Sequence, residues 1–270
     1  EYFTAVSLGA AYRAERWSWN GRVEARRGDR TDSWAVRAAY LRQLREGVTA
    51  AMTVRADETV TDTGAVSRGA EVAGSVAWRP LDSRWAVLDK LEVRKEEARG
   101  IVQGTGVAGY GPTARGDGVT SKIINNLAIN FDSDRGDHTP GAVQASLYHG
   151  TKIVRGRYDG DVRTNVVQVI GAEARLDLTR KIDLGVNLSV RHAGKSGGTA
   201  YAIGPSVGGS PAENTWVSVG YNVVGYHDPD FAAAGYSRKG FYITARVKFD
   251  QNTFANLGSG ARQMIGGMRQ

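Results

Sequence analysis

Histidines, the usual acid–base residues, are few in this sequence, and the nucleophile cysteine is absent. The 270 residues include four histidines and no cysteine, so disulfides and thiolate metal sites are excluded. No histidine has the spacing to a second histidine or a carboxylate that a metal site needs. A hydrolase would need a histidine–serine pair, and no candidate pair comes with an orienting acid or an oxyanion donor. We therefore predict no enzyme activity, no cofactor and no metal. The weak candidates are His149 or His192 with Ser146 or Ser189.

Charged side chains offer a second kind of chemistry, because in many segments they recur at every second position. Side chains alternate between the two faces of a β-strand, so such a segment has one apolar and one polar face. The segment from Ile182 to Arg191 shows the pattern without a break. Its apolar row is Ile182, Leu184, Val186, Leu188 and Val190, and its polar row is Asp183, Gly185, Asn187, Ser189 and Arg191.

The two-residue period recurs along the whole chain, and no helical period persists. No run of about 18 apolar residues occurs, so the sequence has no transmembrane helix. The 35 glycines suit many short strands and turns. Thirteen segments are strand-like: Tyr2–Tyr12, Trp17–Ala25, Trp34–Tyr40, Val48–Ala56, Ala70–Trp78, Trp85–Val93, Ile123–Phe131, Val143–Val154, Val166–Leu176, Ile182–Val190, Tyr201–Val207, Val217–Val223 and Gly240–Phe249.

The polar rows are too highly charged for a dry core, since burying an unpaired ion costs several kcal/mol. They are tolerable if the interior is wide and wet and the apolar rows face lipid. We predict an all-β, antiparallel up-and-down transmembrane β-barrel of about 12–14 strands, apolar outside and with a polar, charged lumen. Residues 1–250 would form the barrel and residues 251–270 a periplasmic tail. The predicted lumen-lining residues are Arg22, Glu24, Arg26, Arg37, Arg55, Glu71, Lys90, Glu92, Arg94, Glu173, Arg175, Arg191, Arg246 and Lys248.

Opposite charges on neighbouring strands can form a ladder that braces the barrel. We expect Glu173 and Arg175 to meet Arg191 in this way. The same charges could instead line an ion pathway with a mild preference for anions.

The connections and the aromatic residues predict an orientation. Short turns at one rim alternate with longer loops at the other, such as Asp57–Ser67, Glu97–Ser121 and Arg155–Arg163. In outer-membrane barrels the short turns are periplasmic. Aromatic residues of the apolar rows gather near the short-turn rim, as expected of a girdle at the bilayer interface. The predicted girdle is Tyr12, Trp17, Trp19, Trp78, Trp85, Phe131 and Phe249.

The strand count leaves the closure of the barrel open. If the last of thirteen strands ends in the periplasm, the first begins on the outer side. Closed barrels of this class have an even number of strands. We therefore expect either one further strand upstream of Glu1, or one wrongly assigned segment, Trp85–Val93 or Tyr201–Val207.

The C-terminal part of the chain carries a family resemblance. Trp216–Tyr226, then Asp228-Pro-Asp-Phe, then Gly240–Gln251, resembles the C-terminal barrel domain of large repeat-bearing surface proteins of Gram-negative bacteria. Ile170–Thr179 fits the same pattern. The resemblance implies a bacterial outer-membrane barrel that carries a long region of the same polypeptide. It implies no catalytic activity.

The last strand also resembles the assembly signal that the barrel-assembly machinery recognises, with apolar residues at alternate positions back from a phenylalanine. This chain departs from that pattern because a tail follows Phe249. The residues of the predicted signal are Phe241, Ile243, Ala245, Val247 and Phe249.

The predicted function follows from the fold and the charge distribution. The net charge is +7, but the arginines are scattered among acids instead of gathered on one face, so nucleic acid is not an expected partner. We predict a non-enzymatic membrane anchor of a larger cell-surface protein. The alternative is a porin-like channel for small, anionic solutes. The expected partners are outer-membrane lipid and lipopolysaccharide, the barrel-assembly machinery and an upstream region of the same polypeptide.

Overall fold

The computed structural model describes a succession of β-strands. It describes residues 2–100, 117–134, 138–158, 160–194, 198–212, 215–226, 228, 230–231 and 238–247. Among these residues, no helix is long and apolar enough to cross a membrane. The strands in chain order are β1 (Phe3–Arg13), β2 (Trp17–Gly28), β3 (Thr31–Arg45), β4 (Val48–Thr61), β5 (Val66–Trp78), β6 (Trp85–Arg99), β7 (Gly118–Asp132), β8 (Val143–Tyr158), β9 (Asp161–Thr179), β10 (Ile182–Ala193), β11 (Gly198–Ala212), β12 (Thr215–Asn222) and β13 (Gly240–Val247).

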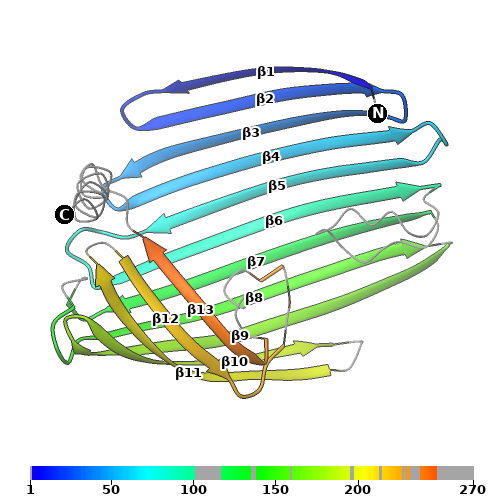
Figure 1. Ribbon diagram of the computed structural model, residues 1–270. Helices are drawn as coiled ribbons and strands as arrows, with labels where there is room; N and C mark the ends of the chain where they lie inside the picture. The colour runs from blue at the N-terminus through cyan, green and yellow to red at the C-terminus, as the bar shows by residue number, and fades with distance from the viewer. Residues whose placement is uncertain are drawn as a thin grey trace, which may run out of the picture.

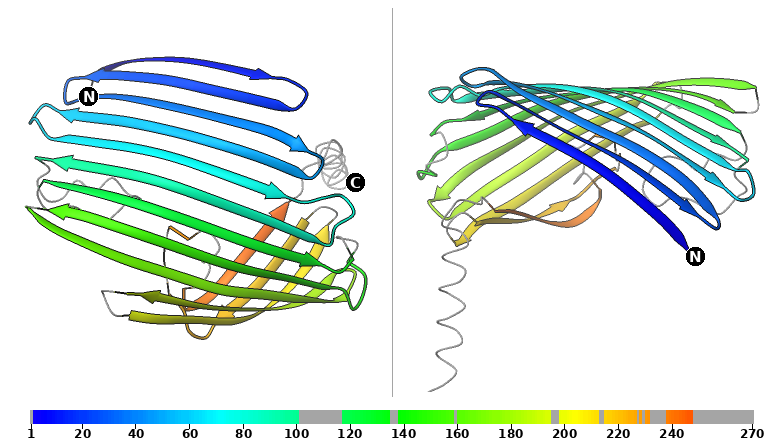
Figure 2. Two further views of the ribbon diagram at one scale, coloured as in Figure 1. Left: turned by 180° about the vertical axis from the view of Figure 1, so that it is seen from behind. Right: turned by 90° about the horizontal axis from the view of Figure 1, so that it is seen from above.

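All thirteen strands belong to one antiparallel sheet, in which each strand pairs with its neighbours in the chain. The sheet curls into an arc, so that β12 and β13 face β7–β9 across its inner side (Figures 1 and 2). We call the inner side of the arc the concave face and the outer side the convex face.

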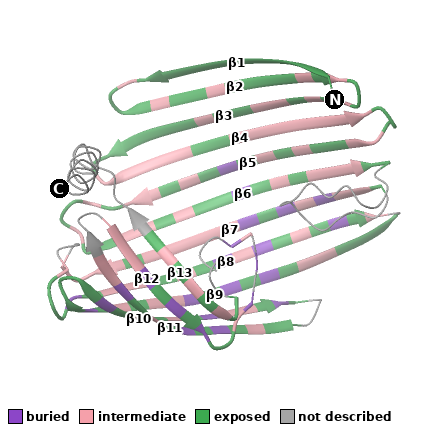
Figure 3. Ribbon diagram, in the orientation of Figure 1, coloured by how far each residue is buried: buried purple, intermediate pink, exposed green. Residues whose placement is uncertain are grey.

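Burial of side chains is inverted relative to a soluble sheet. On β10, Leu184 and Leu188 are 44% and 47% exposed, whereas Asp183 and Ser189 are 6% and 5% exposed. The apolar rows therefore lie on the convex face, and the polar rows lie on the concave face, where the curled sheet covers them. Buried residues concentrate in the strands from β7 onward, while β1–β3 are largely exposed (Figure 3).

The predicted all-β, up-and-down fold and its thirteen strands are confirmed. The two segments named as possible misassignments are both real, because they lie within β6 and β11, each a strand of 15 residues. A wrong strand assignment therefore does not explain the odd number of strands.

Two of the predicted long loops are wrong. β4 continues to Thr61 and β5 begins at Val66, and β8 continues to Tyr158 and β9 begins at Asp161. Both faces of these strand ends carry polar residues, so the contrast between rows disappears while the ladder of backbone hydrogen bonds continues. Most of the third loop, Glu97–Ser121, lies outside the described residues.

The arc is open among the described residues. β1 pairs only with β2, and β13 pairs only with β12. Strand directions alternate across the sheet, so β1 and β13 run in the same direction. An antiparallel closure between these two edges requires an odd number of further strands.

The tight β3–β4 turn depends on Gly47. Its φ is +68°, and a Cβ at this position would lie 2.6 Å from the Cα of Pro80. Gly47→Ala is expected to destabilise the fold by more than the ~1–2 kcal/mol of a left-handed alanine, because the collision with Pro80 adds to that strain. Urea unfolding in detergent measures this loss.

Gly64 provides the matched control. It has a similar φ of +82° but open space around its Cβ position, so Gly64→Ala should show the backbone strain alone. Equal losses in the two variants would contradict the expected collision at Gly47.

Candidate functional site: the charged concave face

Charged side chains form a continuous row across the concave face. Each lies in the polar row of its strand, so the strands themselves aim these side chains inward. The register then brings one charge of each strand beside one of the next. From β2 to β7 the successive partners are Arg22, Arg37, Arg55, Glu71, Arg94 and Lys122.

All the predicted lumen residues whose side chains are described lie on this concave face. The side chain of Arg246 is not described, and Lys248 lies outside the described residues. That the concave face is the lumen of a barrel stays a prediction.

The N-terminal part of the row is cationic. Arg22 forms an ion pair of 3.3 Å with Glu24, and Arg55 one of 2.9 Å with Asp57. Arg37 lies between these two arginines and forms no ion pair with the described residues. Like charges directly opposite each other repel, so this part of the concave face carries an excess of positive charge around Arg37.

The C-terminal part of the row joins a larger, electrically balanced network. Arg94 on β6 lies 3.4 Å from Glu71 on β5, and Lys122 on β7 lies 3.5 Å from Glu96 on β6. Among the described residues, the connected ion pairs contain five acidic and five basic side chains, so these ten side chains carry no net charge together. The acids are Glu71, Glu92, Glu96, Asp228 and Asp230, and the bases are Lys90, Arg94, Lys122, Lys152 and Arg191.

Two acids of this network come from the β12–β13 connection instead of the wall. The Nζ of Lys152, a buried residue on β8, donates hydrogen bonds of 2.7 Å to Asp228 and 2.8 Å to Asp230. The Nε of Arg191 on β10 donates one of 3.1 Å to the other oxygen of Asp228. The connection is thus bound to strands that are not its neighbours in the sheet.

The pKa of the Asp230 carboxyl reflects this environment. Burial works to raise the pKa, but the hydrogen bond and charge of Lys152, aided by Lys122 and Arg94, hold it below the ordinary value of 3.8. The ionised carboxylate therefore stabilises the bound connection above pH 3.8, and this stabilisation is lost as the pH falls through the lowered pKa.

A second polar cluster lies on the concave face near the C-terminal edge. The indole of Trp216 donates a hydrogen bond of 2.6 Å to Asp183, and the guanidinium of Arg175 lies 4.0 Å from the centre of its ring. Arg175 also forms an ion pair with Glu173. This cluster ties β9, β10 and β12 together.

The predicted contact of Glu173 and Arg175 with Arg191 is wrong. The β9–β10 register places Arg191 opposite Val169 and places Glu173 opposite Asn187. Four residues along the strand separate the two positions, and Arg191 binds Asp228 instead.

The weak hydrolase candidates are also wrong, because histidine and serine point to opposite faces. His149 points to the convex face and contacts Thr151. His192 also points to the convex face and contacts Thr199. Ser146 and Ser189 point to the concave face, and the buried Ser189 accepts a hydrogen bond from Tyr226. No group of three or more metal-ligating side chains occurs in the described part of the chain.

Aromatic residues gather at the end of the sheet where β1 ends and β2 begins. The rings of Tyr12 and Trp17 lie 5.1 Å apart, and Tyr40 joins them at 6.1 Å from Trp17. Further along the same end, the rings of Trp85 and Phe131 lie 4.8 Å apart. Trp19 and Trp78 occupy the same end of the convex face, whereas Phe249 lies outside the described residues.

The predicted assembly signal falls on the edge strand β13. Phe241, Ile243 and Ala245 share its convex face and are exposed. Val247 ends the strand. Recognition of this edge by the barrel-assembly machinery stays a prediction.

The lumen-lining residues predicted from the sequence do not include four members of the ion-pair network, Lys122, Lys152, Asp228 and Asp230. Lys152 lies in the polar row of a predicted strand, so the alternation rule could have found it. Lys122 directly precedes the predicted Ile123–Phe131 and lies in the extended end of β7. Asp228 and Asp230 lie in a connection, where no periodicity indicates direction.

The sequence matches no protein-family model and no curated protein. Solved structures nevertheless resemble the fold. The siderophore receptor PirA from Pseudomonas aeruginosa has a TM-score of 0.65 at 7% identity, over 92% of this chain and 49% of the receptor chain. A mutant ferric enterobactin receptor from the same organism, in complex with enterobactin, has a TM-score of 0.64 at 10% identity, over 82% of this chain and 41% of that chain. The translocator domain of the autotransporter NalP from Neisseria meningitidis has a TM-score of 0.34 at 12% identity, over 92% of this chain and 86% of the translocator chain.

The likeness to the two receptors shows the fold. The shared fold is the strand wall of a bacterial outer-membrane β-barrel. The predicted fold class and the predicted resemblance to outer-membrane barrels are therefore confirmed for the fold. The chain spans less than half the length of these receptors.

Proposed function

We propose that this chain is the membrane-spanning part of an outer-membrane protein and anchors a larger polypeptide at the bacterial surface. The observation that carries the proposal is the inverted burial, with leucine and valine exposed on the convex face and ions buried on the concave face. Exposed apolar rows are costly in water but favourable against lipid. If the convex face lies against lipid, the charged concave face must line a wet interior.

The two open edges support the link to a larger polypeptide. Within the described strands, nothing pairs with the outer side of β1 or of β13, and unpaired backbone groups are too costly to leave in the hydrocarbon region. Because the two edges run in the same direction, further strands are needed to close the wall. The anchor acquires these strands from the remainder of the same polypeptide.

The balanced network supports an anchor over an anion channel. Ion pairs of zero net charge and a bound connection occupy the concave face at β5–β10, and they brace this face without favouring either sign of ion. The channel alternative draws its support from β2–β4, where Arg22, Arg37 and Arg55 are adjacent. Conductance separates the two.

Lipid and lipopolysaccharide are the proposed partners of the convex face. Beyond the apolar stretch of β5, Arg68 points outward and pairs with Glu58 beside the indole of Trp34. These three side chains line a shallow groove together with Lys95. Basic side chains directly beyond an apolar band are placed to meet the phosphates of the outer leaflet.

The test uses the full polypeptide that contains this chain, expressed in a Gram-negative host. We expect it to sediment with outer membranes, to lose that location when residues 240–247 are deleted, and to pass no steady current in a planar bilayer. A steady, anion-selective current would overturn the anchor in favour of the channel. Recovery of the intact protein in the soluble periplasm would overturn both.

A further inference from the structure

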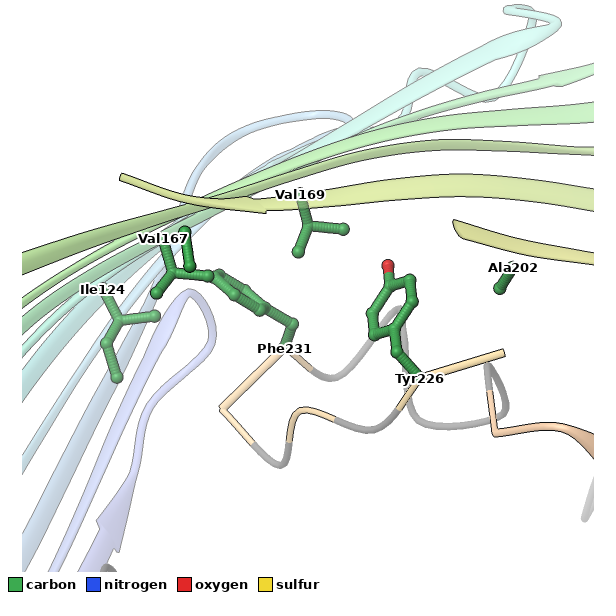
Figure 4. Close-up of a cluster of buried hydrophobic side chains, with 7 residues drawn as sticks. Ile124, Val167, Val169, Ala202, Tyr226 and Phe231 are labelled. Atoms are coloured by element: carbon green, nitrogen blue, oxygen red, sulfur yellow. The ribbon is translucent and has the colours of Figure 1, made fainter. Parts of the chain in front are cut away.

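Four residues of the β12–β13 connection are bound to the concave face: Tyr226, Asp228, Asp230 and Phe231. We call them the internal strap. Tyr226 and Phe231 point from the connection toward the sheet (Figure 4). Both are buried, Phe231 almost completely at 2% exposed. A polar connection at a strand end would ordinarily lie in solvent, so burial of these aromatic rings calls for an explanation.

The wall has a recess that fits Phe231. Gly150 on β8 lies directly beneath the ring, and a Cβ there would lie 2.5 Å from its Cδ1 atom. Ile124 and Val167 belong to the same buried cluster. The ammonium of Lys152 lies 5.2 Å from the ring centre, within the range of a cation–π contact.

Tyr226 provides a second attachment, toward the C-terminal edge. Its hydroxyl donates a hydrogen bond of 3.0 Å to Ser189 on β10. Its ring belongs to the same buried cluster as Val169, Ala193 and Ala202. The polar tip and the apolar body of this side chain are therefore both satisfied.

The carboxylates of the strap complete the attachment between these two rings. The side chain of Asp228 is only 3% exposed and receives hydrogen bonds from β8 and β10. Asp230 binds β8 through Lys152 and lies 3.9 Å from Arg94 on β6. A carboxylate buried to this degree is stable only while its cations remain in place.

We propose that the internal strap is a built-in closure device, which holds the C-terminal end of the sheet curled over β7–β10 and seals that part of the concave face against solutes. The strap connects β12 and β13 to β6, β8 and β10, strands with which neither of them pairs in the sheet, and it adds to the side-chain hydrogen bonds of Asn187 on β10 to Asn222 and Tyr242. This role rests on the proposed membrane-spanning function. Release of the strap would expose Lys152 and Arg191 to the interior.

Thiol labelling tests the strap directly, because the chain has no cysteine of its own. Ala202→Cys places a thiol beneath Tyr226 at a position that is 3% exposed. In the full polypeptide reconstituted in lipid vesicles, a polar maleimide should modify this thiol slowly. Adding Asp228→Asn and Asp230→Asn should raise the rate about tenfold, because loss of charged hydrogen bonds makes local opening easier.

Two controls and a second test variant make the result decisive. Ala5→Cys, on the exposed concave row of β1, should react at the same fast rate with and without the strap substitutions. Asp62→Asn, in the exposed β4–β5 turn, should leave labelling of the Ala202→Cys variant slow. Gly150→Val removes the recess for Phe231 without touching a charge, and it should also speed labelling, so the test survives if the aspartate variants do not fold.

Unchanged labelling at position 202 in a folded, membrane-inserted variant would overturn the strap while leaving the anchor intact. Fast labelling of the parent protein would overturn it as well. Failure of the parent to enter the outer membrane would instead overturn the proposed function.

Discussion

Lys152→Met is expected to lower the free energy of unfolding by about 3–5 kcal/mol, the cost of removing one partner of a buried ion pair. Methionine retains the apolar stem but has no ammonium group. Asp228 and Asp230 then lose hydrogen bonds of 2.7 and 2.8 Å while remaining buried. Urea unfolding of the reconstituted protein, followed by tryptophan fluorescence, measures the loss.

Lys181→Met is the matched control, because Lys181 is exposed in the turn between β9 and β10. It should cost less than about 1 kcal/mol, as exposed charges do. Adding Asp228→Asn and Asp230→Asn to Lys152→Met should recover much of the loss, since the buried charges are removed together. If Lys152→Met costs no more than Lys181→Met, water must solvate the ammonium, and the network is not a buried brace.

Val72→Arg on the convex face is expected to destabilise the inserted protein by about 2–4 kcal/mol, the cost of arginine at the middle of the lipid face of a barrel. Val72 is 45% exposed and lies in the apolar row of β5. The substitution should also lower the fraction of protein that inserts into lipid vesicles. Folding yield and urea unfolding in the same vesicles report both effects.

Leu81→Arg makes the same change in the turn between β5 and β6, where the leucine is 78% exposed. This position lies beyond the apolar band, so insertion and stability should stay near those of the parent. A harmless Val72→Arg would show that lipid does not cover the convex face. Equal damage from both variants would show that the added charge matters everywhere and would remove the support for a membrane band.

Alternation of side chains was sufficient to predict the strands and their faces. A strand such as Ile182–Ala193 carries the whole argument in its own sequence, because each apolar residue has a polar neighbour. Pairing of successive strands then follows from the short connections between them. The sequence therefore predicted the up-and-down order as well as the inverted distribution of polar residues.

The strand ends were harder, and the reason is physical. Near Thr61 and Tyr158 both rows are polar, so the residues no longer report which way they point. Backbone hydrogen bonds continue regardless of side-chain polarity. A pattern of side chains cannot reveal a ladder that the main chain alone maintains.

The internal strap could not have been predicted from periodicity. The Asp228-Pro-Asp-Phe sequence was noticed for its resemblance, but nothing local indicates that it turns inward. Its position depends on Gly150 and Lys152, which lie about eighty residues earlier. Only the tertiary arrangement brings the recess, the ammonium and the phenylalanine together.

The uneven burial across the sheet has a consequence for how the wall varies in width. The strands from β7 onward are bound to one another by the network and the strap, whereas β1 is exposed along its whole length and, among the strands that the structure describes, pairs only with β2. Hairpins can therefore be gained or lost beside β1 without breaking a buried contact. We expect proteins built on this plan to keep a constant C-terminal module and to differ in circumference through the number of hairpins added at the opposite margin.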